Sequence, residues 1–155
     1  MNYLLYAAVV LAVFVFMEWF AWFTHKYIMH GLLWNLHEDH HVPHEHALEK
    51  NDFFALMFAV PSFLLILFGT LNNQPIMLSA GLGVLLYGIA YFFVHDIYVH
   101  RRIKWFQKLD NTYLRAIRIA HKMHHKHLQK NPGESYGFLW VGSKYWEMAR
   151  KRKRK

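Results

Sequence analysis

Three long apolar runs, separated by polar segments, dominate the pattern along the chain. Tyr3–Phe23 has 21 residues with Glu18 as its only charge, and Phe53–Leu71 and Ile76–Val94 are uncharged runs of 19 residues each. An α-helix rises about 1.5 Å per residue, so each run approaches the roughly 30 Å thickness of a bilayer's hydrocarbon core. The pattern predicts an all-α integral membrane bundle with spans at about 3–23, 53–71 and 76–94.

Two other interpretations of these runs are weaker. Fully buried helices of a water-soluble protein are equally apolar, but 155 residues leave too little other material to cover three of them. A cleaved signal peptide would explain the first run, yet Met1-Asn2 provides no basic residue before it and the run exceeds a typical signal core. We expect a permanent first span and a single membrane domain over residues 1–149.

The polar connections predict the orientation. The turn 72–75 (Asn-Asn-Gln-Pro) is uncharged, whereas the segments after the first and third runs carry Lys26, Lys50, Arg101 and Arg102. Lysine and arginine are enriched in cytoplasmic loops. The sequence therefore predicts that the N-terminus and the turn lie outside and that the C-terminus lies in the cytoplasm. Apolar residues at helical spacing over 105–118 predict a further helix on the cytoplasmic interface, with a fourth span as the alternative.

Charge and cysteine content exclude several classes of protein. The net charge is +8, but the final six residues, 150–155, are all basic and form a tail, without which the net charge would be +2. A nucleic-acid-binding domain would instead carry its basic residues on a folded face. The chain has no cysteine, which excludes a disulfide scaffold, a thiolate metal site and a cysteine nucleophile.

Ten of the 13 histidines fall into four short motifs. The pattern HxxxxH followed by HxxHH occurs twice, in the same order. The motifs are His25-Lys-Tyr-Ile-Met-His30, His37-Glu-Asp-His40-His41, His95-Asp-Ile-Tyr-Val-His100 and His121-Lys-Met-His124-His125. The predicted topology places all four at one membrane depth, on the cytoplasmic side.

The spacing within the motifs favours metal binding. HxxHH places three imidazoles on one helical face, where they can converge on one locus. HxxxxH separates its two rings by about 140° on an ideal helix, so either the helix bulges there or the two rings serve different ions. Imidazole is the commonest metal ligand, and ten rings exceed the capacity of one ion. A surface cluster or a pH switch is the alternative for any single motif.

The chemistry of the ligands narrows the choice of metal. Two zinc ions would make a hydrolase or a structural site, but structural zinc prefers four ligands that often include cysteine. An all-nitrogen site of this size better fits a pair of redox-active iron ions that handle dioxygen.

Other polar residues are candidates for supporting roles. Metal-bound imidazoles usually donate their second N–H to a carboxylate or carbonyl. Glu18 is costly inside a membrane run, and its partner is expected to be either a histidine from another segment or a residue of the third run. The remaining candidates are Glu38, Asp39, Asp96 and Glu134 as acceptors, and His44, His46 and His127 as solvated residues or supplementary ligands.

The order of the four motifs, together with the apolar runs, resembles the fatty-acid hydroxylase superfamily of membrane di-iron oxygenases. The dipeptide His30-Gly31 and the tracts 95–102 (HDIYVHRR) and 136–140 (YGFLW) more closely resemble its bacterial β-carotene hydroxylase branch. The resemblance covers about residues 19–146, with no histidine of the motifs missing.

The resemblance implies an enzyme of the bacterial inner membrane that uses dioxygen and electrons from a ferredoxin-type donor. Two iron ions, held by the ten motif histidines, would hydroxylate the β-ionone ring at C3, converting β-carotene to β-cryptoxanthin and zeaxanthin, or canthaxanthin to astaxanthin. An apolar pocket at the helix ends is expected to hold the ring. Its candidate residues are Trp22, Phe23, Met29, Phe92, Phe93 and Tyr98.

Two other functions remain open from the sequence. The first is a hydroxylase or desaturase of fatty acids or sterols. The second is a membrane metal-binding or transport protein, which is disfavoured because transport needs ligands spread through the membrane depth.

Overall fold

The computed structural model describes residues 2–42, 48–103, 109–131 and 133–153. Within them every regular element is helical, which confirms the predicted all-α class. The elements are α1 (Tyr3–Phe23), η1 (Thr24–Leu32), α2 (Trp34–His41), η2 (Lys50–Asp52), α3 (Phe53–Leu71), α4 (Pro75–Tyr91), η3 (Phe92–Val99), α5 (Thr112–His124) and α6 (Ser143–Lys153).

Three helical stretches are long and apolar enough to cross a membrane, namely Tyr3–Leu32, Lys50–Leu71 and Pro75–Val99. They contain the three predicted runs. Only 6%, 17% and 22% of their respective apolar windows are buried inside the protein, and Leu4, for example, is 85% exposed. Apolar surface of this extent suits lipid and not water, so the chain is a membrane protein.

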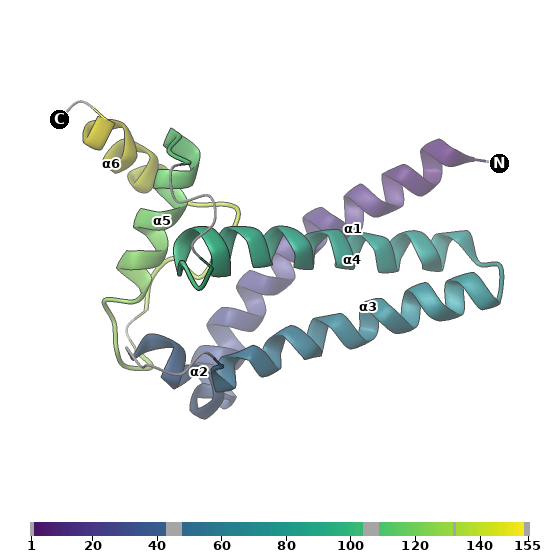
Figure 1. Ribbon diagram of the computed structural model, residues 1–155, viewed down its shortest axis with the longest axis horizontal. Helices are drawn as coiled ribbons and strands as arrows, with labels where there is room; N and C mark the ends of the chain where they lie inside the picture. Colours follow the sequence, from purple (N-terminus) through teal and green to yellow (C-terminus); the bar gives the residue numbers. More distant parts are fainter. Residues whose placement is uncertain (1, 43–47, 104–108, 132, 154–155) are drawn as a thin grey trace.

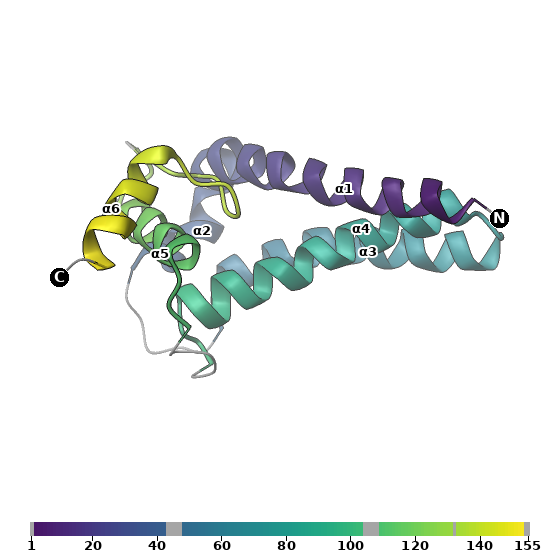
Figure 2. The same cartoon turned by 90° about the horizontal axis from the view of Figure 1, so that it is seen from above.

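The spanning helices form one layered bundle. Helices α3 and α4 lie side by side as an antiparallel hairpin, and α1 packs against α4 (Figure 1). The N-terminus and the α3–α4 turn lie at one end of the molecule, while α2, α5 and α6 lie at the other. From above, α1 spreads away from the hairpin toward the end that carries α2 and α5 (Figure 2).

Glycines set the close approach of these helices. A Cβ atom on Gly69 would lie 2.5 Å from the backbone nitrogen of Leu78, where α3 meets α4, and one on Gly83 would lie 2.8 Å from the carbonyl oxygen of Val10 on α1. Real Cβ atoms cannot come so close, so larger residues would push the helices apart. Gly83 of the third run therefore packs against α1 within the chain.

Helices α5 and α6 pack together around an apolar core of Ala116, Ile117, Ala120, Tyr145 and Ala149. Helix α5 begins later than the predicted range 105–118, because the side chain of Asn111 accepts a hydrogen bond from the backbone N–H of Leu114 at 2.8 Å and caps the helix there. Residues 105–108 of that predicted helix lie outside the described residues. The cap aims α5 so that its last turn carries His121 and His124.

Candidate metal centre

Both HxxxxH motifs lie in π-helical turns at the ends of spanning stretches. The backbone N–H of Leu33 donates to the carbonyl of Ile28, and that of His100 to the carbonyl of His95, each at 2.8 Å. Such i→i+5 bonds widen the turn and are frequent at functional sites. The ring centroids of His95 and His100 are therefore only 4.4 Å apart. Of the two alternatives that the spacing left open, the structure has the bulged helix.

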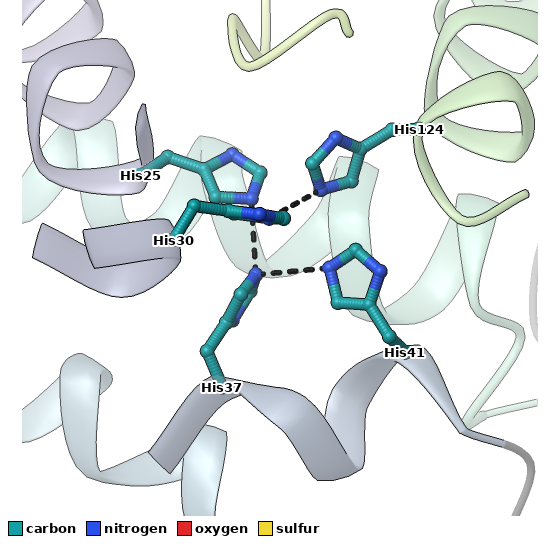
Figure 3. Close-up of side chains that lie close together, drawn as sticks. All are labelled: His25, His30, His37, His41 and His124. Atoms are coloured by element: carbon teal, nitrogen blue, oxygen red, sulfur yellow. Dashed lines mark hydrogen bonds between the residues drawn. The ribbon is translucent and has the colours of Figure 1, made fainter. Parts of the chain in front are cut away.

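The motif histidines gather in two neighbouring groups. Within each group the candidate ligand atoms all lie within 4.8 Å of one another. The first group is His25, His30, His37, His41 and His124, whose rings face a common centre in Figure 3; the second is His40, His95, His100 and His121. His125 adjoins the second group, with its ring centroid 4.4 Å from that of His121. Its Nε2 is buried and has no hydrogen-bond partner among the described residues.

Each HxxHH motif contributes to both groups, whereas the spacing predicted one locus for its three rings. His37 and His41 belong to the first group and His40 to the second; on α5, His121 belongs to the second group and His124 to the first. At about 100° per residue, position i+4 lies roughly 40° to one side of position i, and position i+3 roughly 60° to the other. The middle histidine therefore points to the neighbouring group, and the two helices cross-link the groups.

Every ring of the first group donates its Nδ1–H to an oxygen that can only accept. The acceptors are Tyr136 O at 3.0 Å for His25, Lys130 O at 3.1 Å for His30, Asn51 Oδ1 at 2.7 Å for His37, His127 O at 3.0 Å for His41 and Glu134 O at 2.8 Å for His124. A neutral imidazole carries one N–H, so each Nε2 retains a lone pair. These lone pairs point into the centre of the group.

The Nε2 atoms lie so close to one another that their lone pairs would repel unless a proton or a metal ion lay between them. They are 3.1 Å apart between His25 and His37 and 3.2 Å apart between His37 and His41 (dashed in Figure 3). A hydrogen bond there would need an imidazolium, but burial lowers the pKa of His37 to about 2 and that of His124 to about 3. Neutral rings with converging lone pairs are what a divalent metal requires, so the residues fit a metal ion.

The second group is also compact, but its rings are held differently. The Nε2 atoms of His100 and His121 are 2.7 Å apart, and the Nε2 of His40 is buried with no hydrogen-bond partner in the part of the chain that the structure describes. Burial, reinforced by the neighbouring histidines, lowers the pKa of His100 to about 2 and holds that of His121 well below its usual value. The Nδ1–H of His40 donates to the carboxylate of Glu49 at 2.6 Å.

The candidate supporting residues have varied positions. Asp96 Oδ1 lies 3.5 Å from Nδ1 of His95, whereas Asp39 accepts from the backbone N–H of Lys50. His127 contacts His41 through its backbone carbonyl. His44 and His46 lie outside the described residues. Sequence reasoning missed Glu49 and Asn51, although both directly precede the second span on the histidine side.

Glu18 joins three parts of the bundle. One of its carboxylate oxygens accepts from the hydroxyl of Tyr87 on α4, and the other accepts from the backbone N–H groups of Phe138 and Trp140, all at 2.9 Å. Within the described residues its partners are thus a residue of the third span and the segment that follows α5, and not a histidine. Because Tyr136 in this segment holds His25, Glu18 fixes the segment against the site.

Replacing Glu18 with glutamine is expected to loosen this segment. Hydrogen bonds to a charged group contribute about 1.5–3 kcal/mol, more than neutral ones, so the variant should lose about 1–2 kcal/mol of stability. Thermal unfolding in detergent, and the rate of proteolytic cleavage within residues 133–142, would measure the change. The matched control is Glu38→Gln on the exposed surface; equal behaviour of the two variants would contradict this role.

A cavity of about 590 Å³ lies between the spanning helices and reaches both histidine groups. Apolar side chains line most of it, and His25, His37, His40, His95 and His121 stand at its polar end. Its walls come from α1, α3, α4 and the segment 136–138; they include Met17, Ala21, Phe54, Phe58, Ala59, Ile66, Leu85 and Gly88. The apolar cavity therefore opens directly onto the two histidine groups.

Three of the six predicted pocket residues line this cavity, namely Met29, Phe92 and Phe93. Tyr98 instead packs against the Arg118 guanidinium, whose carbon lies 3.9 Å from the ring centroid. Trp22 and Phe23 are not among the lining residues. They follow Ala21 by about 100° and 200° around α1 and so lie on other faces of the helix.

Comparison with known proteins gives a consistent result. The family model for fatty acid hydroxylase matches residues 10–147. The chain is 42% identical over 131 residues to β-carotene 3-hydroxylase 2 of Arabidopsis thaliana, covering 83% of this chain and 42% of that protein. It is 40% identical to the β-carotene hydroxylase of Pseudescherichia vulneris over 125 residues, covering 81% and 70%.

The chain is also 40% identical to the β-carotene hydroxylase of Pantoea ananas, over 135 residues that cover 87% of this chain and 77% of that protein. The chain therefore spans about 42% of the length of the plant relative and most of the length of the two bacterial ones. No solved structure matches the chain. The matches confirm the resemblance that the motifs indicated.

Proposed function

Since the chain belongs to the fatty acid hydroxylase family, we propose that it is a membrane oxygenase that hydroxylates carotenoid β-ionone rings at C3. One observation carries the proposal: two groups of histidines, each with its candidate ligand atoms within 4.8 Å of one another, stand at the end of an apolar cavity. The names of the relatives, β-carotene hydroxylases from bacteria and plants, support this substrate.

The ten motif histidines would hold two iron ions. The first group would bind one ion through its five rings, and the second group, with His125, would bind the other. When bound, an iron pair supplies activation of dioxygen with external electrons and transfer of one oxygen atom to a C–H bond. The acceptors behind Nδ1 keep each ring in the tautomer that presents Nε2, and the apolar walls of the cavity exclude water.

The cavity supports a substrate that stays largely in the bilayer. Its volume of about 590 Å³ lies within the range of small-molecule sites, roughly 300–1,000 Å³. One rigid ring with part of the polyene would occupy the chamber beside Phe92 and Phe93, while the rest remains in lipid. β-Carotene would give β-cryptoxanthin and then zeaxanthin, and canthaxanthin would give astaxanthin.

We place the site and the C-terminus on the cytoplasmic side of a bacterial inner membrane, with the N-terminus outside. The support is the charge pattern: α6 exposes Lys144, Arg150 and Lys151 at the histidine end of the molecule (Figure 1), and cytoplasmic segments are rich in such residues. A ferredoxin-type protein would deliver electrons on that side.

Reporter fusions are expected to follow this topology. A cytoplasm-active reporter at Lys155 should be active, and a periplasm-active reporter inserted in the turn at Asn73 should also be active. The exchanged pair of reporters should be inactive, which serves as the control. A periplasmic C-terminus would overturn both the topology and the access of a cytoplasmic electron donor.

Pigment analysis of a β-carotene-producing host tests the function. Expression of the chain should convert β-carotene to β-cryptoxanthin and zeaxanthin, and a His30→Ala variant expressed to the same level should not. An unchanged pigment pool with altered fatty acids or sterols would instead favour the second candidate, a hydroxylase or desaturase of those lipids, which the family description also admits.

A further inference from the structure

The two histidine groups differ in the charge that lies directly behind them. In the first group all five Nδ1–H groups donate to uncharged oxygens: four backbone carbonyls and the amide of Asn51. In the second group the Nδ1–H of His40 donates to the Glu49 carboxylate at 2.6 Å, and the Asp96 carboxylate lies 3.5 Å from Nδ1 of His95. Of the two groups, therefore, the second is the one that these contacts place beside carboxylates.

Arg102 fixes these carboxylates in place. Its guanidinium lies 3.0 Å from Glu49, 2.7 Å from Asp52 and 3.3 Å from Asp96. The guanidinium of Arg102 thus contacts all three carboxylates and holds Glu49 and Asp96 on this side of the centre. Glu49 is only 10% exposed at its side chain, so water screens its charge weakly.

A carboxylate that accepts the Nδ1–H of an imidazole makes the Nε2 of that ring a stronger electron-pair donor to a metal ion. It pulls the Nδ1 proton toward itself, raises the electron density at Nε2 and orients the ring. A neutral carbonyl orients the ring equally well but adds no negative charge. The difference between His40 and the rings of the first group is therefore electronic, since an oxygen accepts the Nδ1–H of each of these rings.

We propose that Glu49, positioned by Arg102, makes the two metal sites inequivalent, so that the second group holds its divalent ion more tightly than the first. The ion of the first group is then the one lost more easily. The proposal rests on the proposed function only in assuming that both groups bind metal. It gives Glu49, which lies outside the four histidine motifs, a role in orienting His40 and in supplying negative charge.

Metal titration of the full-length apo protein in detergent tests this proposal without any measurement of turnover. Iron(II) would be added anaerobically, and ⁵⁷Fe Mössbauer spectra would be recorded at one and at two equivalents. The wild type should fill one site first, giving one quadrupole doublet at one equivalent and a second doublet at two. The two dissociation constants should differ by about 10-fold or more.

Two isosteric variants separate charge from shape. Glu49→Gln keeps an acceptor for His40 but removes the charge, and it should weaken the tight site about 10–100-fold while the weak site stays unchanged. Asn51→Asp adds a carboxylate behind His37 and should tighten the weak site. A purely structural role for these side chains would not produce this gain of affinity.

The possible results are distinguishable. Two ions bound with equal affinity, or constants that Glu49→Gln leaves unchanged, would overturn the inequivalence while the proposed function stands. Weakening of both sites to the same extent by Glu49→Gln would also overturn it. A protein that binds no iron at all would overturn the proposed function together with this inference.

Discussion

The largest loss is expected from His37→Ala, which should remove one of the two iron ions and abolish hydroxylation. The Nε2 of His37 lies 3.1 Å from that of His25 and 3.2 Å from that of His41, so it stands at the centre of the first group. Loss of a partner behind a ligand already costs about 10–100-fold in affinity or activity, and loss of a central ligand should cost more. Metal analysis should fall from about two iron ions per chain to about one.

His127→Ala is the matched control for this variant. Its backbone carbonyl accepts the N–H of His41, and alanine retains that carbonyl, so activity and iron content should change far less. Both variants should be compared with the wild type by thermal unfolding. Full activity of His37→Ala with one iron ion per chain would contradict the two-ion account.

The second large effect is expected from Gly88→Phe, which should fill the substrate cavity. Gly88 lines the cavity, and a Cβ atom placed on it would meet no other atom within 4 Å, so the new ring has room to enter. It lies seven residues before His95, two turns or about 10 Å away along the helix. Carotenoid hydroxylation should fall at least about 10-fold, the lower end of what a misplaced substrate costs, while the iron content stays unchanged.

Leu86→Phe is the control on the same helix. Leu86 is 47% exposed and lies outside the lining of the cavity, so its enlargement should leave turnover close to that of the wild type. Equal turnover of Gly88→Phe and wild type would show that the substrate reaches the histidine centre by another route. Loss of iron from Gly88→Phe would show that the substitution disturbs the bundle.

Much of the fold follows from local physical chemistry. The three apolar runs set the number and approximate length of the spans because a helix satisfies its backbone hydrogen bonds within one segment, as lipid requires. The helices then bring His25, His95 and their neighbours to one end of the bundle, although they lie far apart in the sequence. The same reasoning gave two candidate partners for Glu18, and Tyr87 of the third span is one of them.

The distribution of the histidines required the tertiary structure. Spacing alone placed the three rings of HxxHH on one locus. In the structure two groups lie side by side, and His40 and His124 each belong to the other group from the neighbouring histidines of their own motif. The acceptors behind the rings are mostly backbone carbonyls from residues 127–136. Because every residue has a carbonyl, no sequence pattern marks these positions.

The most direct test of the account is the origin of the product oxygen. The purified protein, loaded with iron and supplied with β-carotene, reductant, a ferredoxin-type donor and ¹⁸O₂, should yield zeaxanthin in which each new hydroxyl carries one ¹⁸O atom. Under ¹⁶O₂ in H₂¹⁸O the product should remain unlabelled. Hydroxyl oxygen that comes from water would contradict an oxygenase centre built by these histidines.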